Sequence, residues 1–444
     1  GGDGLAIARM LLENGYSVSA YIIDTQKPGS PDFEINLERL NKISNEIYFL
    51  KNTDAFPALG NDIIIDAIFG TGLNKVVTGI FKKIIHYLNK FAQTIIAIDV
   101  PSGLLIDKSS GGREYNDIIK ATYTLSFQNQ KLGFLMAENG TYTGQVFLLD
   151  IKLSKEFEEK EDSALEFVDK ELIKRLYVPR NSFANKGNYG YACLLTGSYG
   201  MMGAAVLSSR ACLRSGVGKL TCYMCKSGYG IVQSCVPEAM CKTFGNAFIK
   251  DVTDFKSFDV VGIGPGIGRH TSHKQLLHNL FTSFKKSVVI DADALNVMSE
   301  NPALYKLIPE NSIITPHPKE FERLFGKSAS DFERMELAIK KAKQLHIFIV
   351  LKGHFSFIAD PDGKGYFNST GNAGMATAGA GDVLTGIITG LVAQKYSPLS
   401  ACILGVYLHG LAGDLAAKKI SEEGLIAGDI INYLGKAFKE ISSK

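Results

Sequence analysis

Short apolar runs alternate with amphipathic segments along most of this chain of 444 residues, and this pattern limits the fold more than any other feature. In the first half, the predicted strands and helices lie at 17–23, 33–45, 62–69, 79–90 and 94–100. The alternation begins again at Tyr191 and ends in three predicted helices, at 382–395, 399–419 and about 428–440. Ile- and Val-rich runs separated by helices are typical of parallel sheets covered on both faces. The sequence therefore predicts an α/β protein.

A charged stretch separates the two halves. Residues 155–175 include 13 charged residues out of 21, with no apolar period before Leu172. We expect a linker at 154–176 between domains at 1–153 and 177–444, although a surface helix within one larger domain is an alternative interpretation. The sequence also opens as a glycine loop entering a helix, GGDGLAIARMLLENG, without the strand that normally precedes such a loop. We therefore expect a fragment that begins inside a motif.

Charge and composition exclude several classes of partner. Lys and Arg total 48 against 45 for Asp and Glu, so the net charge of +3 predicts neither nucleic-acid nor membrane binding. The seven cysteines are an odd number, and the pair Cys222 and Cys225 lies in an apolar strand without a second pair at zinc-site spacing. We expect buried, reduced thiols and a cytoplasmic protein. The apolar stretch around His409 and Asp414 is interpreted as a buried helix.

Three polar clusters follow predicted strands in the first half. Gly1 to Asp3 precede a helix, Asp66 leads into a loop at 70–74, and Asp99 leads into Pro101-Ser102-Gly103. In parallel sheets, ligands bind at the carboxyl ends of the strands. Each cluster alone could be a helix cap, but together they indicate a nucleotide-sized site. The oxygen ligands here suit a hard cation, if a metal is present.

The segments GGDG, DAIFGTGLN and DVPSG resemble, in order and spacing, the NAD(P)H-hydrate epimerase family. The resemblance implies a Rossmann-like domain with a doubly wound parallel sheet, in which Asp66 and Ser102 hold potassium. In that family two asparagines precede GGDG, one of them a potassium ligand, and here the sequence begins after them. The residues implied to contact the hydrated nicotinamide nucleotide are Gly1, Gly2, Asp3, Gly70, Thr71, Gly72, Leu73, Asn74, Lys75, Val76 and Asp99. Asp99 is our candidate acid/base.

The second half contains a glycine-rich loop that enters a helix, GNAGMATAGAGDVLTG from Gly371. Gly379, Ala380 and Gly381 are small enough for their backbone amides to surround a phosphate group. The helix that follows adds its partial positive end. Asp382 cannot attract phosphate, so we expect it to accept the proton of a substrate hydroxyl next to the transferred phosphoryl group. The alternative is an N-cap aspartate, which leaves the run of small residues unexplained.

Four more clusters follow predicted strands of the second half. Lys352 offers a cation, and Gly353 offers backbone that no side chain covers. His317 lies between two prolines that stiffen its loop. The other two are the glycine loops GPGIG from Gly264 and GSYGMMGA from Gly197. A lone histidine or a lone glycine loop is a weak signal, but we expect all four at the same sheet edge as Asp382.

Together these segments, with DADALN and TPHPKEF, resemble the ADP- or ATP-dependent NAD(P)H-hydrate dehydratase family over about residues 185–440. The resemblance implies a ribokinase-like α/β/α domain. The residues implied to contact the hydrated cofactor are Ala204, Gly266, Gly268, His317 and Asp382. Those implied to bind the nucleotide are Lys352, Gly353, His354, Phe355, Ser356, Asn372, Gly374, Gly379, Ala380 and Gly381. Fusion of the two domains in this order is similar to the bifunctional repair enzymes.

The expected function is repair of hydrated NADH and NADPH. The second domain would phosphorylate the hydroxyl of the S-form hydrate with ADP or ATP and Mg²⁺ and then eliminate phosphate, giving AMP when ADP is the donor. The first domain would interconvert the R- and S-forms with the help of K⁺. We also expect a homo-oligomer. The alternative is a small-molecule kinase of the same fold with a non-catalytic nucleotide-binding first domain.

Overall fold

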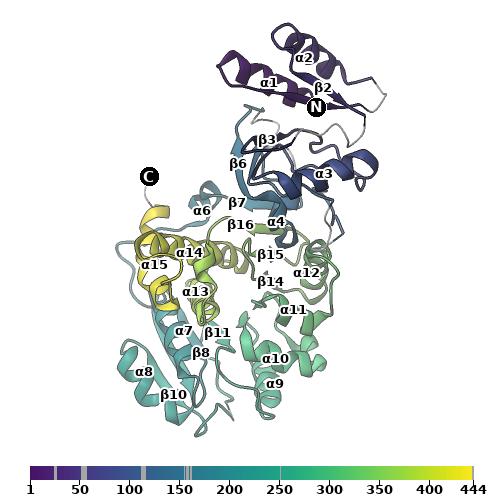
Figure 1. Cartoon of the computed structure of the whole chain (residues 1–444). Coiled ribbons are helices and arrows are strands. Elements are labelled where there is room, and N and C mark those ends of the chain that lie inside the picture. Colours follow the sequence, from purple (N-terminus) through teal and green to yellow (C-terminus); the bar gives the residue numbers. More distant parts are fainter. Residues whose placement is uncertain are drawn as a thin grey trace. The chain divides into compact units, whose positions relative to one another are not determined.

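The computed structural model describes residues 1–24, 28–51, 58–111, 117–154, 156, 160, 163–250 and 252–442. By their internal contacts they divide into two units (Figure 1). Unit 1 comprises Gly1–Glu161 with Ala329–Phe332, and unit 2 comprises Asp162–Ser328 with Glu333–Lys444. Each unit is a mixed α/β structure, as predicted, and each is described separately.

Unit 1 contains two parallel sheets, one of order β1-β2 and one of order β3-β4-β5-β6. Its strands are β1 (Ala20–Ile23), β2 (Ile47–Leu50), β3 (Ile63–Asp66), β4 (Thr94–Ile98), β5 (Tyr123–Phe127) and β6 (Gln145–Leu149). Its helices are α1 (Gly2–Glu13), α2 (Pro31–Asn41), α3 (Gly79–Phe91) and α4 (Gly140–Thr143), with 3₁₀ turns η2 (Leu132–Leu135) and η3 (Ala137–Asn139).

The helices of unit 1 each bury one apolar face. Leu5 and Ala8 of α1 pack with Leu40 of α2 against β1 and β2. Ile85 of α3 packs against Ile95 of β4 in a second cluster. Amphipathic helices cover part of each sheet, as the alternating sequence predicts, but apolar side chains such as Phe49 of β2 and Ile63 of β3 are exposed, so the predicted cover on both faces is not found in the described part of unit 1. The carboxyl ends of β3 and β4 carry the polar clusters.

Unit 2 is built on a ten-stranded sheet of order β10-β9-β8-β11-β12-β13-β14-β15-β16-β7. Its strands are β7 (Leu165–Val168), β8 (Tyr191–Leu195), β9 (Lys219–Met224), β10 (Met240–Thr243), β11 (Val260–Ile263), β12 (Val288–Ile290), β13 (Ile313–Ile314), β14 (Phe348–Leu351), β15 (Phe357–Ala359) and β16 (Gly365–Asn368). All neighbouring strands run parallel except in the meander β14-β15-β16. That meander includes the predicted hairpin through Pro361-Asp362-Gly363.

The helices of unit 2 cover the sheet (Figure 1). They are α6 (Lys170–Leu176), α7 (Met202–Arg214), α8 (Tyr229–Cys235), α9 (His273–Ser283), α10 (Ala292–Glu300), α11 (Pro318–Phe325), α12 (Asp331–Leu345), α13 (Ala380–Ala393), α14 (Pro398–Ile420) and α15 (Ala427–Ser442), with η4 (Lys226–Gly228), η5 (Pro302–Leu307) and η6 (Ala373–Met375). The last three helices begin within two residues of their predicted positions, because strong apolar periodicity marks them locally.

The predicted linker contains two ordered elements of unit 2. β7 pairs with β16, and α6 packs against α14 and α15 with Ile173 fully buried. Asp169 caps α6 by accepting a hydrogen bond from the backbone N–H of Leu172. The high charge of this stretch lies on the outer faces of these elements, so composition alone could not separate them from a linker.

Helix α14 is long and apolar enough to cross a membrane by composition, but it belongs to the core of unit 2. It packs with α13 and α15 in one apolar cluster. This agrees with the interpretation of the stretch around His409 and Asp414 as a buried helix.

Cys222 and Cys225 are buried thiols, as the sequence predicts. Both are free and buried. Burial raises the pKa of Cys222 to about 12, and its Sγ contacts Ser209 Oγ at 3.0 Å. Such a thiol is a small core side chain rather than a nucleophile.

Glycines allow α13 to approach α7 closely. A Cβ on Gly386 would lie 2.2 Å from the carbonyl oxygen of Ser208 and 2.9 Å from Ala211 Cβ. A Cβ on Gly390 would lie 2.8 Å from the carbonyl oxygen of Cys212. Because the obstructing atoms include helix backbone, a side chain at either position would push the two helices apart.

We predict that Gly386→Ala lowers the free energy of unfolding by roughly 1–3 kcal/mol through overpacking. The matched control is Gly435→Ala in α15, where nothing lies within 4 Å of an added Cβ. There the same change should be neutral or stabilising by up to about 1 kcal/mol, because alanine favours helix. Urea unfolding of both variants measures the difference. Equal stability of the two would contradict the proposed helix contact.

Candidate functional site

The motifs of unit 2 meet because neighbouring strands end at the same edge of the sheet. In the order β8, β11, β12, β13 and β14, the strands lead into the loops GSYG, GPGIG, DAD, TPHP and LKG. The carboxyl edge of a parallel sheet is where α/β proteins bind ligands. The structure thus assembles the motifs that are scattered over more than 150 residues of sequence.

The glycine-rich loop enters α13 through a left-handed residue. Gly379 is the N-cap of α13 with φ of +88°, a conformation that a side chain would strain. The first turn that follows contains Ala380, Gly381 and Asp382. The first amides of a helix have no partner within the helix, so they are available to an anion. The geometry therefore supports a phosphate site here.

Lys352 lies in front of this helix start. A Cβ on Gly381 would lie 3.4 Å from Lys352 Nζ and 3.8 Å from Asp291 Oδ2, so the absent side chain makes room for the ammonium group. Lys352 Nζ donates to Asp291 Oδ1 at 2.9 Å and lies 3.9 Å from Glu320 Oε2. Burial lowers the pKa of Lys352, but these two carboxylates outweigh burial and raise it overall. Lys352 is therefore a fixed cation.

Asp382 is a carboxyl group that titrates near neutrality. Burial, and then the charge of Asp291, raise its pKa to about 7, while Lys352 partly opposes the shift. A group of this kind can accept or release a proton at physiological pH. This property fits the acid/base role that the sequence predicts for Asp382.

His317 lies at the start of α11 and is committed on one side. Its Nδ1 accepts from the backbone N–H groups of Lys319 and Glu320, and the Glu320 carboxylate accepts from the backbone N–H of His317, which completes a capping box. Burial lowers the pKa of His317. A neutral ring that accepts at Nδ1 carries its proton on Nε2, which lies 3.4 Å from Glu320 Oε1, so the one hydrogen bond it can donate goes either to that carboxylate or to a ligand. The backbone N–H of Lys352 donates to Pro316 O, which places this loop beside the Lys352 strand end.

The loops predicted to contact the hydrated cofactor also pack together. A Cβ on Gly266 would lie 2.9 Å from Ala204 Cβ, and the Gly266 carbonyl accepts from Ser198 Oγ at 2.9 Å. The backbone N–H of Gly268 donates to Asp293 Oδ2 at 2.9 Å, which ties this loop to α10. Thus Ala204 and Gly266 pack against each other, and Gly268 is buried beside them against Asp293.

The remaining predicted nucleotide residues lie in two loops. Asn372 caps η6 by accepting from the backbone N–H of Gly374, and its side chain donates to Asp414 of α14. In the loop after β14, Gly353 and His354 are exposed, Phe355 stacks edge-on against His354, and Ser356 Oγ donates to the Gly353 carbonyl. Both loops are held by their own hydrogen bonds, with exposed backbone left for a ligand.

Two buried hydroxyls at this edge find no hydrogen-bond partner among the residues that the structure describes. Thr196 Oγ1 follows β8 and Thr315 Oγ1 follows β13, and both residues are fully buried. Buried polar atoms are normally paired. Their positions at strand ends support a site that is completed by water or by ligand atoms.

In unit 1, Asp66 and Ser102 are buried against each other. Ser102 donates to the two carboxylate oxygens of Asp66, through its backbone N–H at 2.8 Å and through Oγ at 2.6 Å. Burial raises the pKa of Asp66, and among the described residues no Lys, Arg or His side chain pairs with it. A buried carboxylate beside a hydroxyl, without a basic side chain, fits a site for a monovalent cation.

Asp99 lies at the end of β4 in a left-handed conformation, with φ of +64°. Its Oδ2 accepts from the backbone N–H of Thr71 at 3.2 Å, so the exposed loop from Gly70 to Val76 is fixed to it. Lys131 Nζ lies 3.8 Å from its Oδ1. The amine of Gly1 donates to Ala67 O, which brings Gly1, Gly2 and Asp3 to the end of β3. The structure therefore assembles the predicted residues of unit 1.

Several residues of these sites were not predicted. Asp291 and Glu320 contact Lys352, and Lys131 contacts Asp99. Asp291 follows a predicted strand, the same signal that identified Asp99, and could have been selected in this way. Glu320 and Lys131 have no comparable local signal, because only the folded chain places them next to the catalytic candidates.

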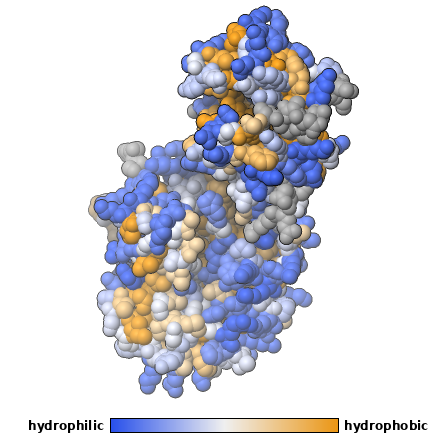
Figure 2. Space-filling model, viewed as in Figure 1, coloured by the Kyte–Doolittle hydropathy of each residue, from blue (hydrophilic) through white to orange (hydrophobic). Residues whose placement is uncertain are grey.

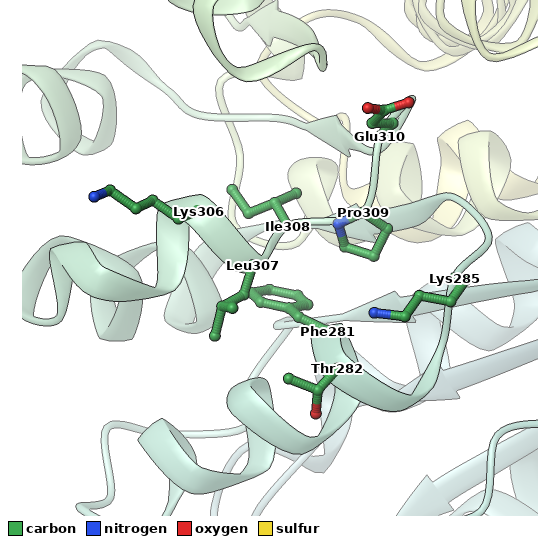
Figure 3. Close-up of a pocket in the computed structure, with 8 residues that line it drawn as sticks. All are labelled: Phe281, Thr282, Lys285, Lys306, Leu307, Ile308, Pro309 and Glu310. Atoms are coloured by element: carbon green, nitrogen blue, oxygen red, sulfur yellow. The ribbon is translucent and has the colours of Figure 1, made fainter.

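A separate cavity of about 360 Å³ lies between the end of α9 and the segment that follows η5 (Figure 3). Phe281 and Leu307 contribute apolar surface, and Lys285, Lys306 and Glu310 surround it. None of the predicted site residues lines it. We therefore place the functional site at the carboxyl edge of the sheet and not at this cavity.

Comparison with known sequences identifies the family. The sequence family described as NAD(P)H-hydrate dehydratase matches residues 192–436, and the family of YjeF-related protein N-termini matches residues 1–133. The bifunctional NAD(P)H-hydrate repair enzyme of Moorella thermoacetica is 33% identical over 460 residues, which cover 100% of this chain and 86% of that protein. The chain belongs to the bifunctional NAD(P)H-hydrate repair enzyme family. The family member of Escherichia coli is 31% identical over 98% of this chain and 82% of its own length.

Solved structures confirm the ribokinase-like fold of unit 2. The ADP/ATP-dependent NAD(P)H-hydrate dehydratase of Bacillus subtilis, crystallised with ATP and Mg²⁺, is 32% identical with a TM-score of 0.55 and covers 62% of this chain and 99% of its own. A ribokinase-like superfamily protein of Enterococcus faecalis is 28% identical with a TM-score of 0.56 and covers 64% of this chain and 99% of its own. Within the repair enzyme family, unit 2 thus corresponds to the dehydratase.

The raised pKa of Asp382 makes a prediction about stability. The pKa of Asp382 is about 7 in the folded chain and near 4 in the unfolded chain. The neutral Asp382 side chain therefore contributes stability that is fully present below pH 4 and is lost as the pH rises through 7. Asp382→Asn never ionises, so it should be more stable than the natural chain at pH 8, by at most about 4 kcal/mol. Attraction between the Asp382 carboxylate and the N-terminus of α13 reduces this difference in stability. Thermal unfolding between pH 4 and pH 8 measures it, and a difference independent of pH would contradict the assigned environment.

Proposed function

We propose that this chain repairs hydrated NADH and NADPH, with unit 2 as the ADP- or ATP-dependent dehydratase and unit 1 as the epimerase. The observation that carries the proposal is the position of Asp382, a carboxyl group with a pKa near 7 in the first turn of a phosphate-binding helix beside a fixed lysine. Family membership over the whole chain supports both activities. The small-molecule kinase remains a less favoured alternative, because the family match of unit 2 is to the dehydratase.

For dehydration, Asp382 would accept the proton of the hydroxyl on the ring carbon next to the nicotinamide nitrogen. The hydroxyl oxygen then forms a bond to the terminal phosphoryl group of the donor, and AMP leaves when the donor is ADP. The nitrogen lone pair expels phosphate with cleavage of the carbon–oxygen bond, and the adjacent ring carbon loses a proton to restore the reduced nicotinamide. Phosphate replaces hydroxide as the leaving group, which is why a nucleotide is needed.

The other residues of unit 2 would bind and position the two reactants. The amides of Gly379, Ala380 and Gly381 would stabilise the charge on the transferred group, and Lys352 would neutralise part of it. His317 would donate from Nε2 to the hydrated cofactor, next to Ala204, Gly266 and Gly268. Residues Gly353 to Ser356, with Asn372 and Gly374, would hold the nucleotide.

Magnesium, when bound, supplies charge neutralisation during phosphoryl transfer. Among the described residues no group of three or more His, Cys, Asp or Glu side chains is arranged to hold a metal ion. The site residues therefore fit an ion that is carried mainly by the phosphate oxygens of the nucleotide. The related dehydratase of Bacillus subtilis was likewise crystallised with ATP and Mg²⁺.

In unit 1, Asp99 would act as the acid/base for inversion at the carbon that carries the hydroxyl. That carbon also bears nitrogen, so reversible loss of its hydroxyl as water gives a planar cation that water can attack from either face. Potassium, held by Asp66 and Ser102, would supply positive charge next to the nucleotide. Residues Gly1 to Asp3 and the loop from Gly70 to Val76 would contact the nucleotide.

Two further properties belong to this proposal. A cytoplasmic location is supported by the free cysteines. A homo-oligomer is supported by exposed apolar side chains on α8 and β10, namely Tyr229, Ile231 and Met240. Figure 2 shows apolar surface over this part of unit 2, while hydrophilic side chains gather over α9 to α12.

The main prediction concerns Asp382→Ala. Loss of a general base lowers the rate of dehydration by roughly 10²–10⁴-fold, measured as recovery of reduced nicotinamide absorbance from the purified S-form hydrate with ADP. Binding of ADP alone should persist, because the amides and Lys352 remain. Unchanged dehydration would exclude the base role, and accumulation of a stable phosphorylated product in the natural chain would favour the kinase.

A second prediction concerns potassium. Replacing K⁺ with Li⁺ should slow the enzyme-catalysed conversion of R-form to S-form hydrate, measured after the spontaneous rate is subtracted. The smaller Li⁺ ion does not fit oxygen ligands that are spaced for K⁺. Asp66→Asn should have the same effect in K⁺. Dehydration of the S-form by unit 2 is the internal control and should not change. If Asp99→Asn converts the epimers as fast as the natural chain, unit 1 is instead a binding module.

A further inference from the structure

Asp291 is a deeply buried charged side chain of unit 2 that the proposed mechanism does not use. It immediately precedes α10 and is 1% exposed. Its Oδ1 accepts from Lys352 Nζ at 2.9 Å, and its Oδ2 accepts from Thr385 Oγ1 at 2.6 Å. Lys352 follows β14 and Thr385 lies in α13, so one carboxylate joins three elements. Because each carboxylate oxygen of Asp291 has its own partner, both the carboxylate and the Lys352 ammonium group are fixed in place.

The location of this ion pair matters because Asp382 is also nearby. Lys352 Nζ lies close to Gly381, one residue before Asp382, and the charges of Lys352 and Asp382 influence each other. Without Asp291, Lys352 would be left between Glu320, whose Oε2 lies 3.9 Å from its Nζ, and Asp382, whose charge also acts on it, so part of its charge would neutralise Asp382. A base neutralised in this way would be a poor proton acceptor. Asp291 holds the lysine in a different pair.

The titratable groups around Asp382 come from four elements. Lys352 comes from the end of β14, and Asp291 and Asp293 come from the start of α10. Beyond Lys352, Glu320 and His317 lie on α11. From α14, His409 is buried with a pKa lowered to about 4 by burial, so it is neutral and donates to the carbonyl of Ala380. The only cation in this set is Lys352, and Asp291 determines its place.

We propose that Asp291 is a positioning residue of the dehydratase, which binds Lys352 and so keeps Asp382 available to take the proton of the substrate hydroxyl. This inference rests on the proposed role of Asp382. Thr385 has a supporting part, because its hydroxyl bond orients the carboxylate that Lys352 contacts. Lys352 then faces the phosphate-binding turn, where its charge serves the nucleotide.

The proposal has a consequence for the pH dependence of dehydration. Asp382 acts as a base only when it is ionised, so the rate should rise with pH through its pKa of about 7. Asp291→Asn removes one nearby negative charge and releases Lys352 toward Asp382. Both changes lower the pKa of Asp382, so the rising limb of the profile should move to lower pH by roughly one unit. The plateau rate should fall by roughly 10- to 100-fold, because Lys352 is no longer positioned.

The experiment is the pH profile of kcat for dehydration of the S-form hydrate at saturating ADP, measured for the natural chain and three variants. Asp291→Asn is the test. Thr385→Val removes one hydrogen bond to Asp291 but leaves its charge, so Lys352 is held less firmly and the limb should move to lower pH by less than in Asp291→Asn. Asp259→Asn is the matched control, because Asp259 lies at the opposite end of β11 in an exposed pair with Lys286. It should leave the profile unchanged.

The outcomes distinguish the proposed role of Asp382 from the proposed role of Asp291. If Asp382→Ala retains full activity, the proposed function of Asp382 fails. If that variant is inactive but the limb of Asp291→Asn does not move, the role of Asp291 is structural and the present proposal is overturned. If Asp291→Asn does not fold, as judged by circular dichroism, Thr385→Val decides. A limb that moves to lower pH would support the proposal, and an unmoved limb, whatever the rate, would overturn it.

Discussion

The site of unit 2 depends on one electrostatic arrangement, a carboxyl group in the first turn of α13 next to a lysine that is already paired. A helix N-terminus attracts anions, and a carboxylate there would normally be fully ionised. Burial and the negative charge of Asp291 oppose this and bring the pKa of Asp382 to about 7. The same turn can therefore bind phosphate through its amides and move a proton through its side chain.

Close packing makes this arrangement possible. α13 approaches α7 through Gly386 and Gly390, and its start is held by the hydrogen bond from His409 of α14 to Ala380. On the strand side, Asp291 and Lys352 link the ends of β12 and β14 to the same helix. The position of Asp382 is thus determined by the core of the unit and not by the loop that precedes it.

The sequence predicts the parts of the structure whose signals are local. The start of α13 is marked by small residues before Asp382, and α14 and α15 by their apolar content, so these were placed within two residues. Composition failed for residues 165–176, because the pairing of β7 with β16 depends on a strand about 200 residues away. The residue types of Asp66 and Ser102 in unit 1, and of His317 and Lys352 in unit 2, marked them as candidate site residues, and within each unit the structure brings the two candidates close to each other.

The hydrogen-bond and ion-pair partners of these residues could not be predicted from the sequence, because the partners become neighbours only when distant strands pair. Nothing near Asp291 in sequence indicates Lys352 or Thr385, and nothing near Asp99 indicates Lys131. The same holds for His317, where the sequence predicts a presented imidazole but not that Nδ1 is used to cap α11. In each case the hydrogen bonds of the residue come from the fold.

The most direct test of the central claim follows the oxygen atom of the substrate. S-form hydrate labelled with ¹⁸O at its hydroxyl is converted by the natural chain with ADP and Mg²⁺, and the phosphate produced is analysed by mass spectrometry. Transfer of phosphate to that hydroxyl followed by elimination predicts that the label appears in inorganic phosphate. Label recovered in water, with unlabelled phosphate, would show that the hydroxyl leaves without being phosphorylated and would contradict this account.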